Sequence, residues 1–241
     1  MKKKRLDEIL MKNGLVKDKN EAFIVVTEGR VLVAEQKAVS PAQMVSANAK
    51  IEIRGVEQFV GRGAYKLEAA LEKFSVDANG KICADIGAAT GGFTQVLLNH
   101  GAKRVYAIDT ARGKLALKLR GARRVVVMEG TDVRDLEKLP EPVNIVTIDV
   151  SLISLRDILP AAARFLDSSG SVIALFKPQY EARDKKVLRH GIVESAEIRE
   201  NLFKEFLVWV KNNNWKVRSW MESPIKGSKG NIEYLVYLAL C

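Results

Sequence analysis

Short apolar runs separated by amphipathic segments dominate residues 62–241. Segments with helical periodicity, such as 94–101 and 155–166, lie between these runs. Continuous apolar strands that alternate with helices are typical of a parallel sheet covered on both faces. The pattern therefore predicts an α/β domain with five parallel strands, at 82-ICADI-86, 104-RVYAID-109, 124-RVVVM-128, 143-VNIVTID-149 and 172-VIALFK-177.

The alternation of strand and helix breaks near the C-terminus. Two apolar segments, 215–223 and 232–240, are joined by a stretch that contains Pro224, Gly227 and Gly230. Two strands with a short connection are most simply antiparallel. Five parallel strands plus an antiparallel pair form an outline similar to the Rossmann-like sheet of class I methyltransferases.

The first 54 residues follow a different pattern. Apolar positions around 6–10 and 22–26 predict two short amphipathic helices, and Asn13-Gly14 separates them. The alternating segments 30–40 and 51–54 then suit a small sheet. We therefore expect a small α+β domain at 1–54, a linker at 55–61 and the α/β domain at 62–241.

Charge adds a candidate partner. The 241 residues carry a formal net charge of +10, and a basic excess suggests a polyanion such as nucleic acid or an anionic membrane surface. No apolar run approaches the roughly 18 residues of a spanning helix. Only Cys83, Cys241, His100 and His190 could supply soft or imidazole ligands, so no metal site is expected. We expect a cytoplasmic protein without a metal or a membrane association.

A glycine-rich loop follows the first strand of the α/β domain. Gly87 to Thr94 has the spacing of a phosphate-binding P-loop, but Phe93 stands where that loop needs lysine. Ala89 occupies the second glycine position of the dinucleotide fingerprint. Asp85, just before the loop, would repel a pyrophosphate and attract a cation. These features favour S-adenosylmethionine, which carries a sulfonium and an amino group.

Acidic residues also follow the next two strands. Asp109 ends the second strand, where a carboxylate can accept hydrogen bonds from both ribose hydroxyls of a nucleotide. Asp132 follows the third strand and could accept from the adenine amino group. Because the carboxyl ends of parallel strands meet at the ligand-binding edge, we expect these residues to meet there. A helix cap or a solvated loop is the alternative for any one of them alone.

Four further charged residues could supply chemistry at this edge. Asp149 and Lys177 end the fourth and fifth strands, Glu233 opens the last strand, and Lys66 lies on the first helix of the domain. The helix has Leu67, Ala70, Leu71 and Phe74 as its apolar stripe. An exposed ion pair is the alternative for Lys66 and Glu233.

These residues and their surroundings resemble a known family. The order Lys66, Asp149, Lys177, Glu233 is similar to the Lys-Asp-Lys-Glu tetrad of FtsJ-like ribose 2′-O-methyltransferases. The TlyA family, also called haemolysin A, resembles the chain nearly end to end, through 62-RGAYKL-67, 148-IDVS-151, 176-FKPQYE-181 and 230-GNIE-233. The N-terminal segment is similar to an S4 RNA-binding domain.

The resemblance implies methylation of ribose 2′-hydroxyls in ribosomal RNA or ribosomal subunits, with S-adenosylmethionine as donor. Lys177 is the expected general base, with Lys66 beside it and Asp149 and Glu233 orienting it; lysines that only position the ribose are the alternative. Expected cofactor contacts are Asp85, Gly87, Ala88, Thr90, Gly91, Gly92, Phe93, Asp109, Asp132, Val133 and Asp149.

Basic residues provide the expected RNA contacts. Eight Lys or Arg residues and one acid lie between 103 and 124, beside the proposed active edge. A solvated charged face is the alternative for such a run. The expected RNA-binding residues are Arg5, Lys12, Lys17, Lys19, Arg30, Lys37, Arg62, Arg112, Lys114 and Lys118.

Two other functions compete with the methyltransferase. One is an RNA-binding protein whose methyltransferase fold has lost activity, which an intact tetrad disfavours. The other is a haemolysin-type membrane-active protein, which the lack of a spanning or strongly amphipathic lytic segment disfavours. A small-molecule methyltransferase would leave the basic N-terminal domain without a role.

Overall fold

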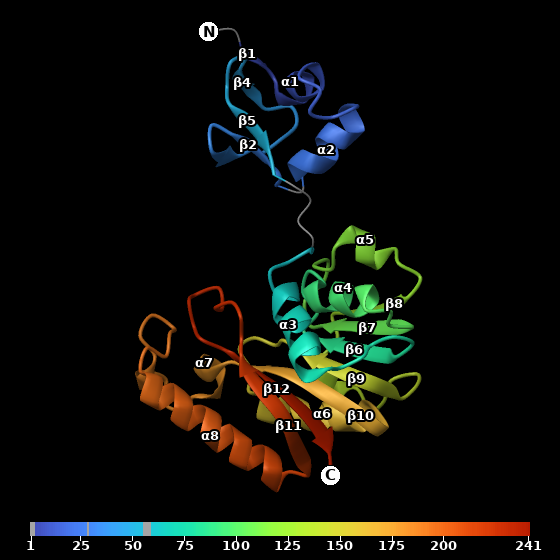
Figure 1. Ribbon diagram of the computed structural model, residues 1–241, viewed down its shortest axis with the longest axis vertical. Coiled ribbons are helices and arrows are strands. Elements are labelled where there is room, and N and C mark those ends of the chain that lie inside the picture. The colour runs from blue at the N-terminus through green and yellow to red at the C-terminus, as the bar shows by residue number, and fades with distance from the viewer. Residues whose placement is uncertain (1–2, 28, 55–58) are drawn as a thin grey trace. The chain divides into compact units, whose positions relative to one another are not determined.

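The computed structural model describes residues 3–27, 29–54 and 59–241 (Figure 1). The chain divides into two compact units, Met1–Gln58 and Phe59–Cys241. The predicted linker, 55–61, spans this division, and its residues 55–58 lie outside the described part of the chain. Residues 59–61 belong to the second unit: Phe59 is buried in its core, and the Val60 N–H donates to Gln95 Oε1 at 2.8 Å.

The N-terminal unit packs two short helices against small sheets. Leu6, Ile9 and Leu10 of the first helix meet Val25 and Val26 of the second in a common core, so the two predicted helices are confirmed. The described elements are β1 (Lys3–Arg5), α1 (Leu6–Lys12), α2 (Lys19–Thr27), β2 (Val31–Val33), β3 (Gln36–Lys37), β4 (Met44–Ser46) and β5 (Ile51–Ile53). Strand β1 pairs with β4, and β2 lies between β3 and β5.

A tight hairpin divides the predicted segment 30–40. Val33 pairs with Gln36, so Ala34 and Glu35 alone form the turn. Both residues have positive φ, at 48° and 68°, as a type I′ turn requires and as Asn-Gly adopts more easily. Ala34 and Glu35 are therefore less favourable at these turn positions than Asn-Gly would be, because both must adopt a positive φ.

A seven-stranded sheet forms the centre of the C-terminal unit. Its strands follow the order β11-β12-β10-β9-β6-β7-β8, and the five from β10 to β8 are parallel. Strand β12 is antiparallel to both of its neighbours. The predicted sheet is confirmed, with strands β6 (Ile82–Ile86), β7 (Arg104–Asp109), β8 (Val125–Glu129), β9 (Val143–Ile148), β10 (Leu166–Phe176), β11 (Trp215–Glu222) and β12 (Tyr234–Leu240).

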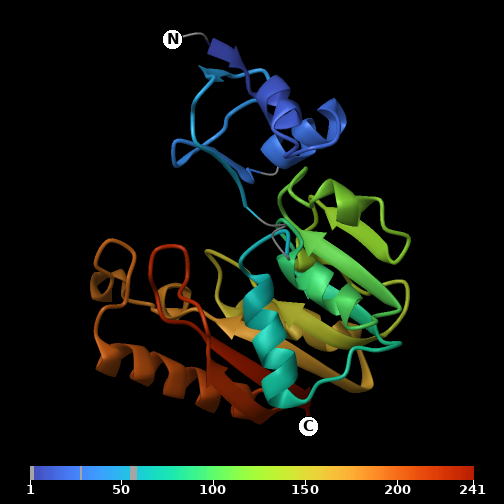
Figure 2. The same ribbon diagram turned by 45° about the horizontal axis from the view of Figure 1, so that its top comes forward.

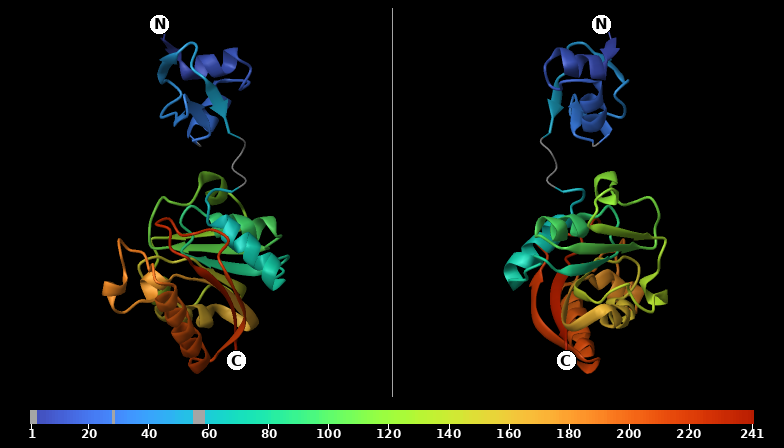
Figure 3. Two further views of the ribbon diagram at one scale, coloured as in Figure 1. Left: turned by 60° about the vertical axis from the view of Figure 1, so that its left-hand side comes forward. Right: turned by 90° about the vertical axis from the view of Figure 1, so that its right-hand side faces the viewer.

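Helices cover both faces of this sheet, as Figures 2 and 3 show. Side chains of α3, α4 and α5 join one core cluster, and those of α6 and α8 join the other. The helices are α3 (Ala64–Phe74), α4 (Gly92–Asn99), α5 (Leu117–Arg120), α6 (Leu155–Phe165), α7 (Pro178–Glu181) and α8 (Ala196–Asn212), with 3-10 turns η1 (Val133–Asp135) and η2 (Lys185–Val187).

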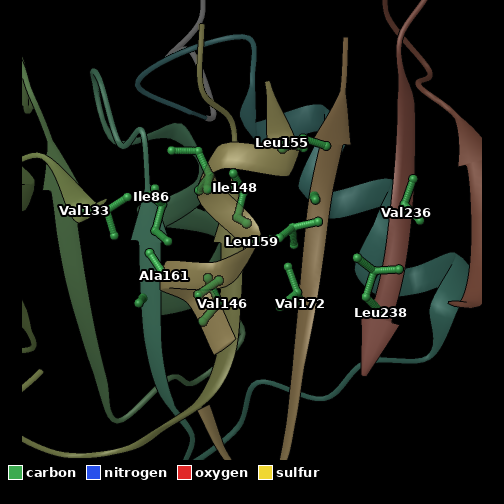
Figure 4. Close-up of a cluster of buried hydrophobic side chains, with 14 of the residues drawn as sticks. Ile86, Val133, Val146, Ile148, Leu155, Leu159, Ala161, Val172, Val236 and Leu238 are labelled. Carbon is green, nitrogen blue, oxygen red and sulfur yellow. The ribbon is translucent and has the colours of Figure 1, made fainter. Parts of the chain in front are cut away.

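Alternation along the strands assigns side chains to the two cores. In β10, Val172 and Ala174 join the cluster of α6 and α8, whereas Ile173 and Leu175 join the cluster of α3 and α4. Figure 4 shows part of the cluster of α6 and α8, where Leu159 of α6 lies among strand residues. Period-two alternation between two covered faces explains why the strands read as continuous apolar runs.

Chain order reverses at the centre of the sheet and positions the site. The chain moves from β6 outward to β7 and β8, then returns to β9 on the other side of β6. Ligands of open α/β sheets bind outside the carboxyl ends of the strands at such a switch point. Here the Asp149 N–H donates to the Ile86 carbonyl at 3.0 Å, which joins the ends of β9 and β6.

Candidate active site

A cavity of about 630 Å³ at the carboxyl edge of the sheet contains all four tetrad residues in its lining. Lys66 lies in α3, Asp149 follows β9, Lys177 follows β10 and Glu233 precedes β12. Residues separated by up to 167 positions in the sequence therefore meet at one place. We call this space the tetrad cavity.

The tetrad forms two short ion pairs. Lys66 Nζ lies 2.6 Å from Glu233 Oε2, and Lys177 Nζ lies 2.6 Å from Asp149 Oδ1. The side chains of Lys66 and Glu233 are 9% and 3% exposed, which excludes the exposed ion pair as an explanation. Burying charges costs several kcal/mol per ion unless they are paired, so each lysine needs its own carboxylate.

Local sequence explains the position of each lysine. Lys66 occurs one residue before Leu67 on the buried stripe of α3, and 7% of the residue is exposed. Lys177 has extended backbone angles, φ −119° and ψ 102°, immediately before Pro178 at the start of α7, as the residue before a proline prefers. Its Nζ also contacts Ser151 Oγ at 3.3 Å.

The glycine loop passes directly beside the tetrad. Gly87 has φ +83°, and a Cβ there would lie 2.5 Å from the Asp149 carbonyl oxygen. Gly91 has φ +93°, and its Cβ would meet Leu115 and Leu119 of the following segment. Glycine is required at both positions by conformation and by close approach. Of the expected cofactor contacts, the tetrad cavity contains Gly87, Ala88, Thr90, Gly92, Phe93 and Asp149 in its lining.

A second cavity of about 400 Å³ lies on the other side of Gly87 and Asp149, which line both cavities. Three of the expected cofactor contacts, Asp109, Asp132 and Val133, line this space, and their contact with a nucleoside remains a prediction. Asp109 accepts the backbone N–H groups of Ala89 and Ala111, at 2.8 and 2.7 Å. We call this space the nucleoside cavity.

Asp132 has a strong partner of its own. Its carboxylate binds the Arg134 guanidinium at 2.6 Å and caps η1 through the Arg134 N–H. Hydrogen bonds from Arg134 lower the pKa of Asp132 to about 2. The carboxylate is therefore ionised and retains acceptor capacity toward the cavity, while a contact with adenine remains a prediction.

Asp85 lies behind the loop rather than at either cavity. It is fully buried, and its carboxylate accepts from Thr94 Oγ1 at 2.6 Å and from Thr147 Oγ1 at 3.1 Å. Burial raises its pKa to about 6, against the hydrogen bonds of both threonines. The structure thus gives Asp85 a role in holding the start of α4, and its direct contact with a cofactor remains a prediction.

The contacts that hold the loops of the tetrad were not predictable from the sequence. Glu181 at the end of α7 accepts from Ser154 Oγ at 2.7 Å, from the Leu155 N–H at 2.6 Å and from Arg156 Nη1 at 2.9 Å. Burial raises the pKa of Glu181. Two features of the sequence relate to these contacts: Glu181 ends the FKPQYE motif, and Ser154 precedes a predicted helix as its N-cap. Neither feature predicts that Glu181 and Ser154 contact each other.

Gln179 was also missed. It lines the tetrad cavity, and its Nε2 donates to Glu233 Oε1 across 3.4 Å.

Glu129, at the end of β8, was missed as well. It accepts hydrogen bonds from the backbone N–H groups of residues 113–115 and from the Arg120 side chain. These contacts lower the pKa of Glu129 to about 2. They also fix the backbone of residues 113–115, in the basic segment that follows Asp109.

The expected RNA-binding residues are mostly exposed. Arg62 lies on the rim of the tetrad cavity. Arg30 is half-buried and donates to the Arg54 carbonyl, and Arg5 forms an ion pair with Asp7. Their contact with RNA remains a prediction, as it does for the exposed residues Lys12, Lys17, Lys19, Lys37, Arg112, Lys114 and Lys118.

Within 3–27, 29–54 and 59–241, no three His, Cys, Asp or Glu side chains form a group suited to a metal ion. The same part of the chain has no helix with the length and apolarity needed to cross a bilayer.

Known proteins are similar in sequence to this chain over most of its length. The FtsJ-like methyltransferase model matches residues 59–240. "Hemolysin A" of Brachyspira hyodysenteriae is 36% identical over 98% of the chain and all of its own length. "16S/23S rRNA (cytidine-2'-O)-methyltransferase TlyA" of Mycobacterium tuberculosis is 35% identical over 97% of the chain and 89% of its own length.

Solved structures agree with these matches. A structure of a protein named as a hemolysin from Streptococcus thermophilus has a TM-score of 0.75 and 36% identity, and covers 100% of this chain and 89% of its own. An S-adenosylmethionine-dependent methyltransferase from Listeria monocytogenes has a TM-score of 0.55 at 18% identity, which shows the fold alone. The chain therefore belongs to the FtsJ-like methyltransferase family, in the group that contains the proteins named TlyA and hemolysin A.

Proposed function

We propose that this protein transfers a methyl group from S-adenosylmethionine to a ribose 2′-hydroxyl in ribosomal RNA. The observation that supports this most directly is the tetrad, which lines one cavity beside the glycine loop. Lys66 and Glu233 form a buried ion pair there, and Lys177 forms a second pair with the partly exposed Asp149. The M. tuberculosis relative is named for this reaction on cytidine in 16S and 23S rRNA.

The two adjoining cavities fit the proposed cofactor. Asp109 and Asp132 supply carboxylate acceptors in the nucleoside cavity, which suits ribose hydroxyls and an adenine amino group. Gly87 and Asp149 line both cavities, so a ligand that spans the two cavities passes over Gly87. A Cβ at this position would clash with the Asp149 carbonyl oxygen. Once bound, S-adenosylmethionine supplies a methyl group already activated by the sulfonium.

The residues of the tetrad then handle the proton and the orientation of the ribose. Lys177, once its own proton has passed to solvent, would take the proton of the 2′-hydroxyl onto Nζ, as a general base typically worth about 10²–10⁴-fold in rate. The 2′-oxygen would bond to the methyl carbon as the bond between that carbon and the sulfonium breaks, which leaves a neutral thioether. Asp149 holds the Lys177 amine at 2.6 Å and stabilises the ammonium that results. Lys66 and Glu233 position the hydroxyl, since correct orientation can contribute roughly 7–11 kcal/mol.

Charge and the N-terminal unit support RNA as the substrate. The net charge is +10, and phosphate contacts dominate the affinity of proteins for nucleic acid. The N-terminal unit resembles an S4 domain, and we assign it to recruitment of ribosomal RNA. It carries the exposed residues Lys12, Lys17, Lys19 and Lys37.

Alkali distinguishes this reaction from methylation of a base. Because the 2′-oxygen attacks the adjoining phosphodiester during alkaline cleavage, its methylation protects that linkage. Ribosomal RNA and subunits treated with the protein and methyl-labelled S-adenosylmethionine should yield one or a few labelled, alkali-resistant linkages. Label found only on bases, with every linkage cleavable, would refute 2′-O-methylation and leave a broader RNA methyltransferase.

A further inference from the structure

Two loops form part of the wall of the tetrad cavity. Residues 182–193 contribute Lys185, and residues 223–231 contribute Lys226 and Lys229. We call these two loops, with the three lysines, the basic wall. None of these lysines belongs to the tetrad, and both Lys226 and Lys229 are exposed.

Asn231 joins the two loops of the basic wall. Its side chain accepts the Val193 N–H at 3.0 Å and donates to the Gly191 carbonyl at 2.9 Å. Its own carbonyl accepts the Gly227 N–H at 2.9 Å. Asn231 is 3% exposed, so these bonds are shielded from water, and the two loops present their lysines together.

The basic wall also touches the tetrad. A Cβ on Gly227 would lie 2.5 Å from Glu233 Oε1, so the loop backbone passes directly against this carboxylate. The Lys229 side chain lies over Gly191, where a Cβ would meet its Nζ at 3.4 Å. A group bound by the wall is therefore held next to the residues that act on the ribose.

The lining of the tetrad cavity carries more positive than negative charge. The acidic residues of its lining are Asp149 and Glu233, and each already pairs with a tetrad lysine. Lys185 Nζ donates to the Ala182 carbonyl at 2.7 Å. Across the described ranges, no acidic side chain forms an ion pair with Lys226 or Lys229, so the wall presents uncompensated positive charge.

We propose that Lys226 and Lys229 bind the phosphate groups that flank the nucleotide to be methylated. This rests on the proposed function, since the 2′-oxygen is linked to the 3′-phosphate through C2′, C3′ and O3′ of one ribose. A 2′-hydroxyl at the tetrad thus brings its phosphate to the adjoining wall. Lysine ammonium groups suit this ligand as point charges.

The salt dependence of RNA affinity tests the assignment. Affinity falls with log salt with a slope of about −0.7 per phosphate contact in single strands. With 16S and 23S rRNA transcripts, the slope of the Lys226→Ala/Lys229→Ala double variant should be shallower by about 1.4 than that of the intact protein, because two phosphate contacts are lost. Between 50 and 200 mM salt its affinity should fall about sevenfold less than that of the intact protein.

A matched double variant, Lys138→Ala/Lys204→Ala, removes the same charge from exposed sites of the same unit that line neither cavity. It should keep the original slope. The wall variant should raise KM for RNA while kcat at saturating RNA stays within about twofold, because a contact with a phosphate that does not react is equally strong in the bound substrate and in the transition state.

The inference is overturned if the wall variant keeps the slope of the intact protein, or if both double variants change it equally. A fall in kcat with an unchanged slope would also overturn it. Failure of the proposed function gives a different result: the intact protein would leave all 2′-oxygens unmethylated, whatever the slopes show.

Discussion

The carboxylate of Glu181 accepts the backbone N–H of Leu155, with 2.6 Å between Oε1 and N. This bond ties α7, which begins directly after Lys177, to the start of α6, which follows the loop of Asp149. Glu181 thus links the segments that carry Lys177 and Asp149, the ion pair that we propose to be catalytic, and it lines neither cavity.

Replacing Glu181 should weaken both stability and turnover. Glu181→Ala leaves the Leu155 N–H and the partly buried Arg156 without their acceptor, which should cost about 2–4 kcal/mol in the free energy of unfolding. We expect kcat to fall at least about tenfold, because small displacements at a reacting centre are costly. Denaturant unfolding and methyl transfer measure the two effects.

Glu181→Gln provides the comparison, since it retains an oxygen for the Leu155 N–H. It should recover part of both losses, and Glu200→Ala, at an exposed position of α8, should show neither. A Glu181→Ala protein with unchanged kcat would contradict the positioning role.

Substitution of Lys177 separates proton removal from positioning. Lys177→Ala should lower kcat by about 10²–10⁴-fold, or about 3–5 kcal/mol in the barrier. Lys177→Arg keeps the positive charge beside Asp149 but cannot be deprotonated, so a general base predicts that it too is nearly inactive. Alkali-resistant linkages in treated RNA provide the measurement.

Cofactor titration is the necessary control for these variants, because Lys177 is assigned to the ribose and should leave cofactor affinity intact. Substantial methyl transfer by Lys177→Arg would instead favour the view that the lysine positions the ribose and shares its charge.

Asp109 should control cofactor affinity. Asp109→Ala removes the proposed acceptor for ribose hydroxyls and the present acceptor of the Ala89 and Ala111 N–H groups. Because hydrogen bonds to charged groups contribute about 1.5–3 kcal/mol, calorimetry should show affinity for S-adenosylmethionine at least about tenfold weaker. Unchanged affinity in this variant would contradict the assignment of Asp109 to the cofactor, and affinity abolished by a chelator would contradict binding without a metal.

The buried carboxyl of Asp85 should make stability depend on pH. Its pKa rises from 3.8 to about 6 on folding, so the folded state binds the proton more tightly. This contribution to the free energy of unfolding is complete below about pH 4 and is lost as pH rises through about 6, amounting to about 3 kcal/mol.

Asp85→Asn removes that proton and its pH dependence. The unfolding free energy of the variant minus that of the intact protein should therefore rise by about 3 kcal/mol between pH 4 and pH 8. Denaturant titrations at the two pH values measure the difference, in which contributions of other carboxylates cancel. A constant difference would show that Asp85 is not protonated in the folded state below pH 6.

Periodicity made the sheet predictable, and strand ends indicated Asp149 and Lys177. The family resemblance joined these two residues with Lys66 and Glu233 as a tetrad. An apolar run fixes a strand, and a charged residue at its carboxyl end, such as Lys177, has to face the binding edge. Pairing was not predictable: which carboxylate each lysine contacts depends on how α3 and the residue before β12 approach the sheet. Asp85 lies one residue before the end of β6, whereas Asp109 is the last residue of β7. The contacts of Thr94 and Thr147 with the buried Asp85 carboxylate were not predictable.

Asn231 limits how this enzyme scaffold can be re-engineered for a different RNA. Its side chain bonds to the backbone of 182–193 while its own carbonyl accepts the Gly227 N–H, so a chimaera whose exchanged loop moves the Val193 N–H, the Gly191 carbonyl or the Gly227 N–H inherits a mismatched joint. The joint is adjacent to Glu233, so the mismatch also reaches the tetrad. An exchange of either loop therefore has to take both loops, Asn231 included, as one module.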